Sequence, residues 1–174
     1  MIEIIIGNIA SIGAMICDSY SGTRRTRRDM LIAQIFSQFF YIASSLVLKA
    51  YSATTQNVVT VFRNLVAIKK DPSKKVAIFF TALPVVLGLI FNNRGLMGLL
   101  PIVANLEYSI IMFACPKNVN AIKLALIINC SLFAVFNFYV LNFVSAIASI
   151  IISVTTAISL YKSKKEKSIE AKNE

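Results

Sequence analysis

The sequence predicts an all-α membrane protein, a bundle of seven transmembrane helices in a single domain. Of its 174 residues, 57% are hydrophobic and 15% are charged, against roughly 45–50% and about 25% in soluble domains. Long apolar runs follow one another with short breaks, and a spanning helix needs about 20 mostly apolar residues. The basic residues gather in those breaks. The core of a soluble domain of this length would not bury so much apolar surface. We therefore expect the lipid bilayer to surround the protein.

The apolar runs define the predicted helices in order. Within lipid, an isolated segment satisfies its backbone hydrogen bonds only as a helix, and the strict alternation typical of membrane barrels is missing. The predicted spans are Ile2–Cys17, Met30–Leu48, Thr54–Ile68, Val76–Phe91, Leu96–Phe113, Ala121–Phe138 and Val140–Tyr161. The third span is short and carries Arg63, and only Tyr139 separates the last two. Merging those two would leave six spans.

The positive charges in the breaks predict the orientation. With seven spans and an external amino terminus, 15 of the 18 basic residues fall on one side, whereas Lys49 and Arg94 fall on the other. Cytoplasmic loops are enriched in Lys and Arg, which predicts a cytoplasmic carboxyl terminus and a basic cytoplasmic tail at 162–174. Six spans would place that tail beside Lys49 and Arg94. The residues expected to set the topology are Arg24, Arg25, Arg27, Arg28, Lys69, Lys70, Lys74 and Lys75.

Composition also excludes several classes of function. The chain has no histidine, which removes imidazole catalysis and histidine-containing metal sites. Its three cysteines lie far apart at or within apolar runs, as buried small side chains do. No paired carboxylates are available for acid–base work. We therefore expect neither an enzyme nor a metal or cofactor, and the placement of the charges argues against nucleic acid as a partner.

A faint internal repeat predicts how the helices are grouped. An offset of 93 residues sets 52–53 on 145–146, and an offset of 94 sets Ala10 on Ala104. Three helices, one helix and three helices would make two parallel triplets related by an axis along the membrane normal. The predicted division is a first repeat at about 2–70, a linker helix at about 76–91 and a second repeat at about 96–161, all within one transmembrane domain at 1–161.

One stretch of the chain resembles a known family. Its features are a Ser-Tyr-Ser turn after residue 18, the basic cluster Arg24–Arg28, Gln34, the segment Ala50–Ala53, and Arg63-Asn64 ahead of a lysine pair. This pattern resembles the YgjV-type bacterial inner membrane proteins, and a looser similarity covers nearly the whole chain. The resemblance implies location in the bacterial inner membrane. Its layout is similar to that of triple-helix-bundle transporters such as the SWEET sugar carriers and PnuC vitamin carriers, although the Pro-Gln signature of the PQ-loop relatives is missing.

Two formal charges, Arg63 and Glu107, lie well inside predicted spans. Burying either alone costs at least about 2.5 kcal/mol, so each needs a partner or a role. Both fall in the predicted cytoplasmic half and would meet across the third and fifth helices. Arg63 would snorkel to headgroups, form a structural pair or bind a solute. Glu107 would be protonated, paired or exposed to water, as on an ion path.

Intramembrane amides surround these charges, among them Asn57, Asn64 and Asn105. They either hydrogen-bond between helices or line a polar cavity for a small solute. We therefore expect a small-solute transporter or facilitator of unknown substrate. The alternative is a non-transport scaffold or partner subunit. Transport predicts an amide-lined cavity between the triplets, whereas a scaffold predicts a dry, tightly packed centre.

Overall fold

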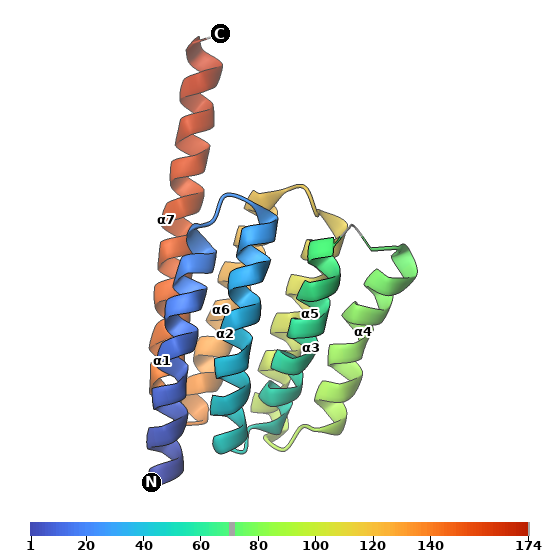
Figure 1. The fold of residues 1–174 in the computed structure, drawn as a ribbon, viewed down its shortest axis with the longest axis vertical. Coiled ribbons are helices and arrows are strands. Elements are labelled where there is room, and N and C mark those ends of the chain that lie inside the picture. Colours follow the sequence, from blue (N-terminus) through green and yellow to red (C-terminus); the bar gives the residue numbers. More distant parts are fainter. Residues whose placement is uncertain (70–71, 174) are drawn as a thin grey trace.

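The chain folds into helices that run up and down beside one another (Figure 1). The structure, a computed structural model, describes residues 1–69 and 72–173. Within that part the helices are α1 (Ile2–Thr23), α2 (Arg27–Val47), α3 (Tyr51–Lys69), α4 (Lys74–Ile90), α5 (Leu99–Ala114), α6 (Val119–Tyr139) and α7 (Phe143–Asn173), with a 3₁₀ turn η1 (Gly95–Gly98) ahead of α5. The predictions of an all-helical fold and of seven helices are confirmed.

Five of the helices described are long and apolar enough to cross a membrane: α1, α2, η1 with α5, α6, and α7 as far as Ser163. The other two differ for separate reasons. Helix α4 has only 17 residues and contains Pro84. Helix α3 is polar, but it directs Val58, Phe62 and Leu65 outward and buries side chains such as Asn64. The polar groups of α3 thus face other helices, where they find hydrogen-bond partners.

Two helix boundaries differ from the sequence prediction in a way that affects the site. Helix α1 ends at Thr23 rather than at the predicted Cys17. The next residue, Arg24, has an extended backbone. Polar residues such as serine and aspartate do not by themselves end a helix, so the apolar run underestimates its length. Helix α3 begins at Tyr51 rather than Thr54. The longer α1 places Asp18 inside the bundle.

Six helices form a closed ring, and α4 lies outside it. Around the ring, α1 contacts α2, α2 contacts α3, α3 contacts α5, α5 contacts α6, α6 contacts α7, and α7 returns to α1 (Figure 1). Helix α4 packs against α3 and α5. A Cβ atom on Gly22 of α1 would meet the Thr156 hydroxyl of α7, so this glycine permits a close approach along the α1–α7 contact. The inward faces of six helices consequently share one centre.

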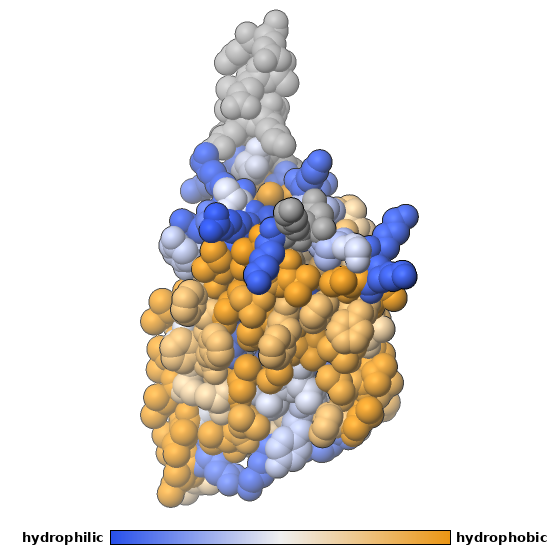
Figure 2. Space-filling model, turned by 45° about the vertical axis from the view of Figure 1, so that its right-hand side comes forward, coloured by the Kyte–Doolittle hydropathy of each residue, from blue (hydrophilic) through white to orange (hydrophobic). Residues whose placement is uncertain are grey.

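The surface has an apolar band between two polar ends (Figure 2). The α1–α2, α3–α4 and α5–α6 loops lie at one end, together with the basic helix ends beside them, and Lys49 and Arg94 lie at the other end. Lys70 falls outside the described residues, as do the side chains of the tail beyond Ser163. Lys123 is one of the 15 basic residues assigned above to one side of the membrane, but it lies on α6 and its side chain is 3% exposed. Its Nζ donates a hydrogen bond to Ser159 Oγ at 2.7 Å.

Two pairs of helices begin at the same offset along the chain. Helices α2 and α6 each have 21 residues and begin 92 positions apart, as do the starts of α3 and α7. The turns after α2 and α6 match as well: Lys49 and Leu141 adopt positive φ angles of 54° and 60°. In both turns the next N–H donates to a carbonyl five residues earlier at 2.9 Å. The boundaries of these helices thus recur one residue short of the predicted sequence offset of 93.

Candidate functional site

The ring of helices encloses a cavity of about 70 Å³, which is enough for a few water molecules. Its lining comes from the inward faces of all six ring helices. The formal charges among the described lining residues are Asp18 and Arg63. Of the predicted site residues, Arg63, Asn57 and Asn105 line this cavity, whereas Asn64 and Glu107 do not. The structure thus contains a small central cavity with amides in its lining, as transport would require.

Arg63 is anchored by neutral groups. Its Nε donates to Asn64 Oδ1 at 3.2 Å and its Nη1 to Ser109 Oγ at 2.8 Å. The guanidinium carbon lies 4.9 Å from the centroid of the Tyr108 ring, a cation–π arrangement. The side chain is 2% exposed, so it does not snorkel to the headgroups. Its Nη2 has no hydrogen-bond partner among the described residues.

Gln34 of α2 connects the groups that surround Arg63. Its Nε2 donates to Tyr108 Oη at 3.0 Å, and its Oε1 accepts from Asn64 Nδ2 at 3.2 Å. The same Asn64 accepts from Arg63 through its other amide atom. Asn64 therefore positions Arg63 from behind the cavity wall, which is the interhelical role that the sequence left open for these amides.

Asn105 of α5 joins two helices and also lines the cavity. Its Nδ2 donates to Gln56 Oε1 at 3.2 Å, and its Oδ1 accepts from Thr60 Oγ1 at 3.3 Å. Gln56 in turn donates to the Pro84 carbonyl at 2.7 Å and so fastens α4 to α3. Asn57 lines the cavity from the next position of α3. Both proposed roles of the amides thus occur in one network.

Asp18 is a site residue that the sequence analysis missed. It lies on α1 just past the predicted end of the first span, and its side chain lines the cavity. The carboxylate accepts hydrogen bonds from Ser37 Oγ and from the Tyr41 hydroxyl, both on α2. A carboxylate next to an apolar run, followed by only weakly polar residues, was the signal that would have found it.

Glu107 lies outside the cavity, and the contact expected between it and Arg63 is not formed. Arg63 bonds to Asn64 and Ser109 instead. Glu107 precedes Tyr108 by one residue, which is about 100° around a helix, so the two face different directions. Its side chain is partly buried, and Oε2 has no hydrogen-bond partner among the described residues. When a span is apolar on all its faces, the sequence does not show which of two neighbouring residues in it faces inward.

At three levels the cavity is polar on α2 and apolar on α6, and Asn129 and Asn137 of α6 also line it. Helices α2 and α6 contribute side chains at positions related by the offset of 92. The lining pairs are Gln34 and Leu126, Gln38 and Cys130, and Tyr41 and Phe133. In each pair the α2 residue carries a hydrogen-bonding group where the α6 residue is apolar. A ligand at the level of these three pairs would contact polar groups on α2 and apolar side chains on α6.

Apolar packing closes the two ends of the cavity unequally. Toward the end with Lys49 and Arg94, the buried cluster consists of Ala50, Ala53, Phe136 and Val140. Toward the basic end, a cluster of eleven buried residues includes Met30, Met112 and Ile152. The buried apolar cluster is therefore smaller at the end that carries few basic residues.

The family assignment follows from a comparison with known families. A family model described as Imp-YgjV, bacterial inner membrane protein, matches residues 5–167. The chain belongs to this family. Neither the curated proteins nor the solved structures contain a match. The resemblance stated from the sequence is confirmed, and the apolar helices of this Imp-YgjV protein agree with a multi-pass protein of the bacterial inner membrane.

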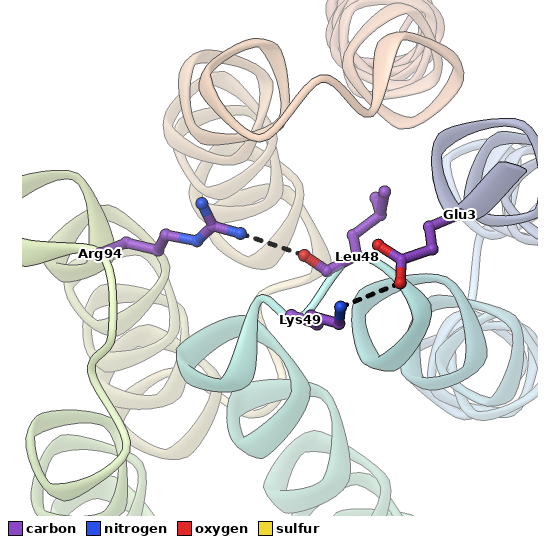
Figure 3. Close-up of polar contacts among 4 residues, drawn as sticks. All are labelled: Glu3, Leu48, Lys49 and Arg94. Carbon is purple, nitrogen blue, oxygen red and sulfur yellow. Dashed lines mark hydrogen bonds and ion pairs between the residues drawn. The ribbon is translucent and has the colours of Figure 1, made fainter. Parts of the chain in front are cut away.

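In this Imp-YgjV protein the turn between α2 and α3 is tied from two sides (Figure 3). Lys49 Nζ lies 2.9 Å from Glu3 Oε1 of α1, with both side chains about 60% exposed. Arg94 Nη2 donates to the Leu48 carbonyl at 3.0 Å, and Asn93 Nδ2 donates to the Lys49 carbonyl at 2.8 Å. The hydrogen bond to Glu3 and the attraction of its charge raise the pKa of Lys49. The ion pair is thus present at neutral pH and lost as pH rises through that pKa.

Asn142 closes the same end of the Imp-YgjV bundle on the opposite side of the ring. Its Nδ2 donates to Ser44 Oγ at 2.9 Å, and its Oδ1 accepts from Ser11 Oγ at 3.1 Å and from the Ser145 N–H at 3.2 Å. One side chain thereby joins α1, α2 and the start of α7. Removing it would leave buried hydroxyls with fewer partners.

We expect Asn142→Ala to destabilise the fold by about 1–3 kcal/mol, because interhelical hydrogen bonds in membranes contribute about 0.6 kcal/mol on average and up to about 1.7. Reversible unfolding in mixed micelles would measure the change. The matched control is Ser131→Ala, since the exposed Ser131 bonds only to Ile127 O of its own helix. Equal stabilities of the two variants would contradict a structural role for the Asn142 network.

Proposed function

We propose that this protein is a small-solute transporter or facilitator of the bacterial inner membrane, without enzymatic activity. The observation that supports this most strongly is the cavity at the centre of the ring, lined by Asp18, Arg63 and several amides. Intramembrane charges are costly, and they commonly mark solute or ion pathways. The alternative, a scaffold or partner subunit, predicts a dry and tightly packed centre, which the polar lining disfavours.

The arrangement of the helices supports a way of moving the solute. The offset of 92 relates α2 to α6 and α3 to α7. In the ring, α1–α7 and α3–α5 are then equivalent contacts between two triplets, α1–α3 and α5–α7, with α4 as the connecting helix. We propose that rocking of one triplet against the other opens the cavity alternately to each side. The smaller apolar cluster at the Lys49 and Arg94 end supports a state that opens more easily at that end.

Uptake by proteoliposomes tests the transport proposal directly. Purified protein would be reconstituted and offered a panel of radiolabelled sugars, nucleosides, amino acids and organic acids, with empty liposomes as the baseline. We expect saturable uptake of at least one solute. If no compound enters faster than into empty liposomes, the transport proposal should be abandoned in favour of the scaffold.

Filling the cavity should block uptake whatever the solute. Ser149 of α7 lines the cavity, and its Oγ bonds only to the Ser145 carbonyl of its own helix. We expect Ser149→Leu to lower the initial uptake rate by roughly tenfold or more, because extra methylenes occupy space that the solute needs. Ser131→Leu is the matched control, since Ser131 is exposed on α6 and makes the same kind of bond within its helix. Unchanged uptake by Ser149→Leu would contradict a path through this cavity.

A further inference from the structure

Gln38 and Arg63 each have a buried polar atom at the cavity without a protein partner, and these atoms indicate what a ligand must supply. The lining amides of Asn57, Asn129 and Asn137 also make no side-chain hydrogen bond among the described residues. Gln38 lines the cavity and is 9% exposed, yet its Oε1 has no hydrogen-bond partner. Arg63 is 2% exposed, and none of the described residues accepts a hydrogen bond from its Nη2. Buried polar groups are nearly always paired. A ligand that completes this site would donate to Gln38 and accept from Arg63.

The charges of the cavity refine this requirement. Asp18 accepts from Ser37 and Tyr41, which lie on either side of Gln38 along α2. The negative charge is therefore close to the unpartnered Gln38 acceptor. A carboxylate has about four acceptor positions, and an ammonium group supplies three donors, so an ammonium suits this end of the cavity. At the other end, the Arg63 guanidinium suits a carboxylate.

The separation of the two ends matches a short zwitterion. Arg63 lies at the level of Gln34, because Asn64 and Tyr108 bond to that glutamine. Asp18 lies at the level of residues 37–41 of α2. Three to seven residues correspond to roughly 5–10 Å along a helix. Two hydrogen bonds of about 2.8 Å, together with the spacing of the charged groups in an α-amino acid, fill this distance.

The apolar side chains that α6 contributes beside Asn129 and Asn137 complete the description of the ligand. Leu126, Cys130 and Phe133 face the polar side chains of α2 and offer them no charged group. We propose that the cavity binds a small zwitterionic amino acid with an apolar side chain, its carboxylate on Arg63, its ammonium between Gln38 and Asp18, and its side chain against α6. This inference rests on the transport function proposed above and names its solute class.

Binding of four related probes to the full chain in lipid nanodiscs tests the inference. The probes for titration calorimetry are L-valine, L-valinamide, 3-methylbutanoate and L-serine. The second lacks the carboxylate, the third lacks the ammonium and the fourth lacks the apolar side chain. We expect L-valine to bind most tightly and each of the others to bind roughly tenfold or more weakly, since each loses a charge-assisted contact or the apolar contact.

Two substitutions assign the ends of the ligand. In Arg63→Gln, L-valine and L-valinamide should bind with similar affinity, because the group that distinguishes them is gone. In Asp18→Asn, L-valine and 3-methylbutanoate should likewise become similar. Glu107→Gln, which lies outside the cavity, should keep the wild-type order. Should a variant fail to fold, the order of affinities in the wild-type chain still decides the matter.

Equal affinity of the wild-type chain for L-valine and either singly charged analogue would overturn the inference, and so would binding of none of the four probes. The results that overturn this ligand class differ from those that overturn the transport proposal. Uptake of sugars or nucleosides without amino acids would overturn the ligand class and keep transport. Selective L-valine binding without any uptake would keep the ligand class and overturn transport.

Discussion

Replacing Arg63 with glutamine should lower solute uptake by roughly tenfold to a hundredfold at substrate concentrations below saturation. A hydrogen bond to a charged group contributes about 1.5–3 kcal/mol, and each 1.4 kcal/mol corresponds to a factor of ten. Arg63 is the described cation that lines the cavity, and its Nη2 is free to bind an anionic group. Initial rates of uptake into proteoliposomes would measure the effect.

Two further variants distinguish a binding role of Arg63 from a structural one. Arg63→Lys keeps the charge but loses the planar fork of donors, so we expect an intermediate rate. Glu107→Gln changes the other predicted intramembrane charge, which lies outside the cavity, and should leave the rate unchanged. If Arg63→Gln transports at the wild-type rate while its thermal unfolding is also unchanged, Arg63 has no part in binding the solute.

The fold was predictable because lipid imposes simple rules on a sequence. An apolar run in hydrocarbon must be helical, and loops must reach water, so the number and order of the helices follow from hydropathy. Helix ends followed less well: α1 continues past Cys17 to Thr23 through residues that are polar but helix-compatible. The pairing of helices in the ring depends on side-chain packing, for which hydropathy gives no information.

The candidate site was predictable only in part, for a related reason. Arg63 was recognised because a charge inside a span is costly wherever its helix faces. Glu107 satisfied the same criterion but lies outside the cavity, since the direction of a residue in a uniformly apolar helix cannot be read from the sequence. Asp18 and Gln38 acquire their importance from neighbours on other helices. Such convergence appears only once the ring is formed.

The apolar lining residues Leu126, Cys130 and Phe133 of α6 and the polar lining residues of α2 would suit a solute with two different faces. At the offset of 92 between the starts of the two helices, Tyr41 corresponds to Phe133 and Gln38 to Cys130. Each substitution removes a hydrogen-bonding group while keeping a side chain that packs. A cavity with equal walls would favour a symmetric ligand or water, whereas this one favours a molecule with a polar and an apolar side.

The basic end of the bundle should face the cytoplasm, with the amino terminus outside. Cytoplasmic loops of inner membrane proteins retain Lys and Arg, and each basic residue near an anionic leaflet contributes about 1 kcal/mol. The loop that holds Arg24 and Arg25 and the start of α4 at Lys74 lie at one end, opposite Lys49 and Arg94. The opposite orientation would place most basic residues on the outer face and lose that attraction.

Cysteine labelling of intact cells would measure this orientation. In a background with Cys17, Cys115 and Cys130 replaced by alanine, Lys74→Cys samples the start of α4 and Leu96→Cys samples the η1 turn at the other end of the bundle, both at exposed positions. A membrane-impermeant maleimide should label Leu96→Cys in intact cells but Lys74→Cys only after permeabilisation. The reverse pattern would invert the proposed topology. Changing Arg24, Arg25, Arg27 and Arg28 to glutamine should then produce mixed labelling, because the remaining basic loops alone would determine which way the first helices insert.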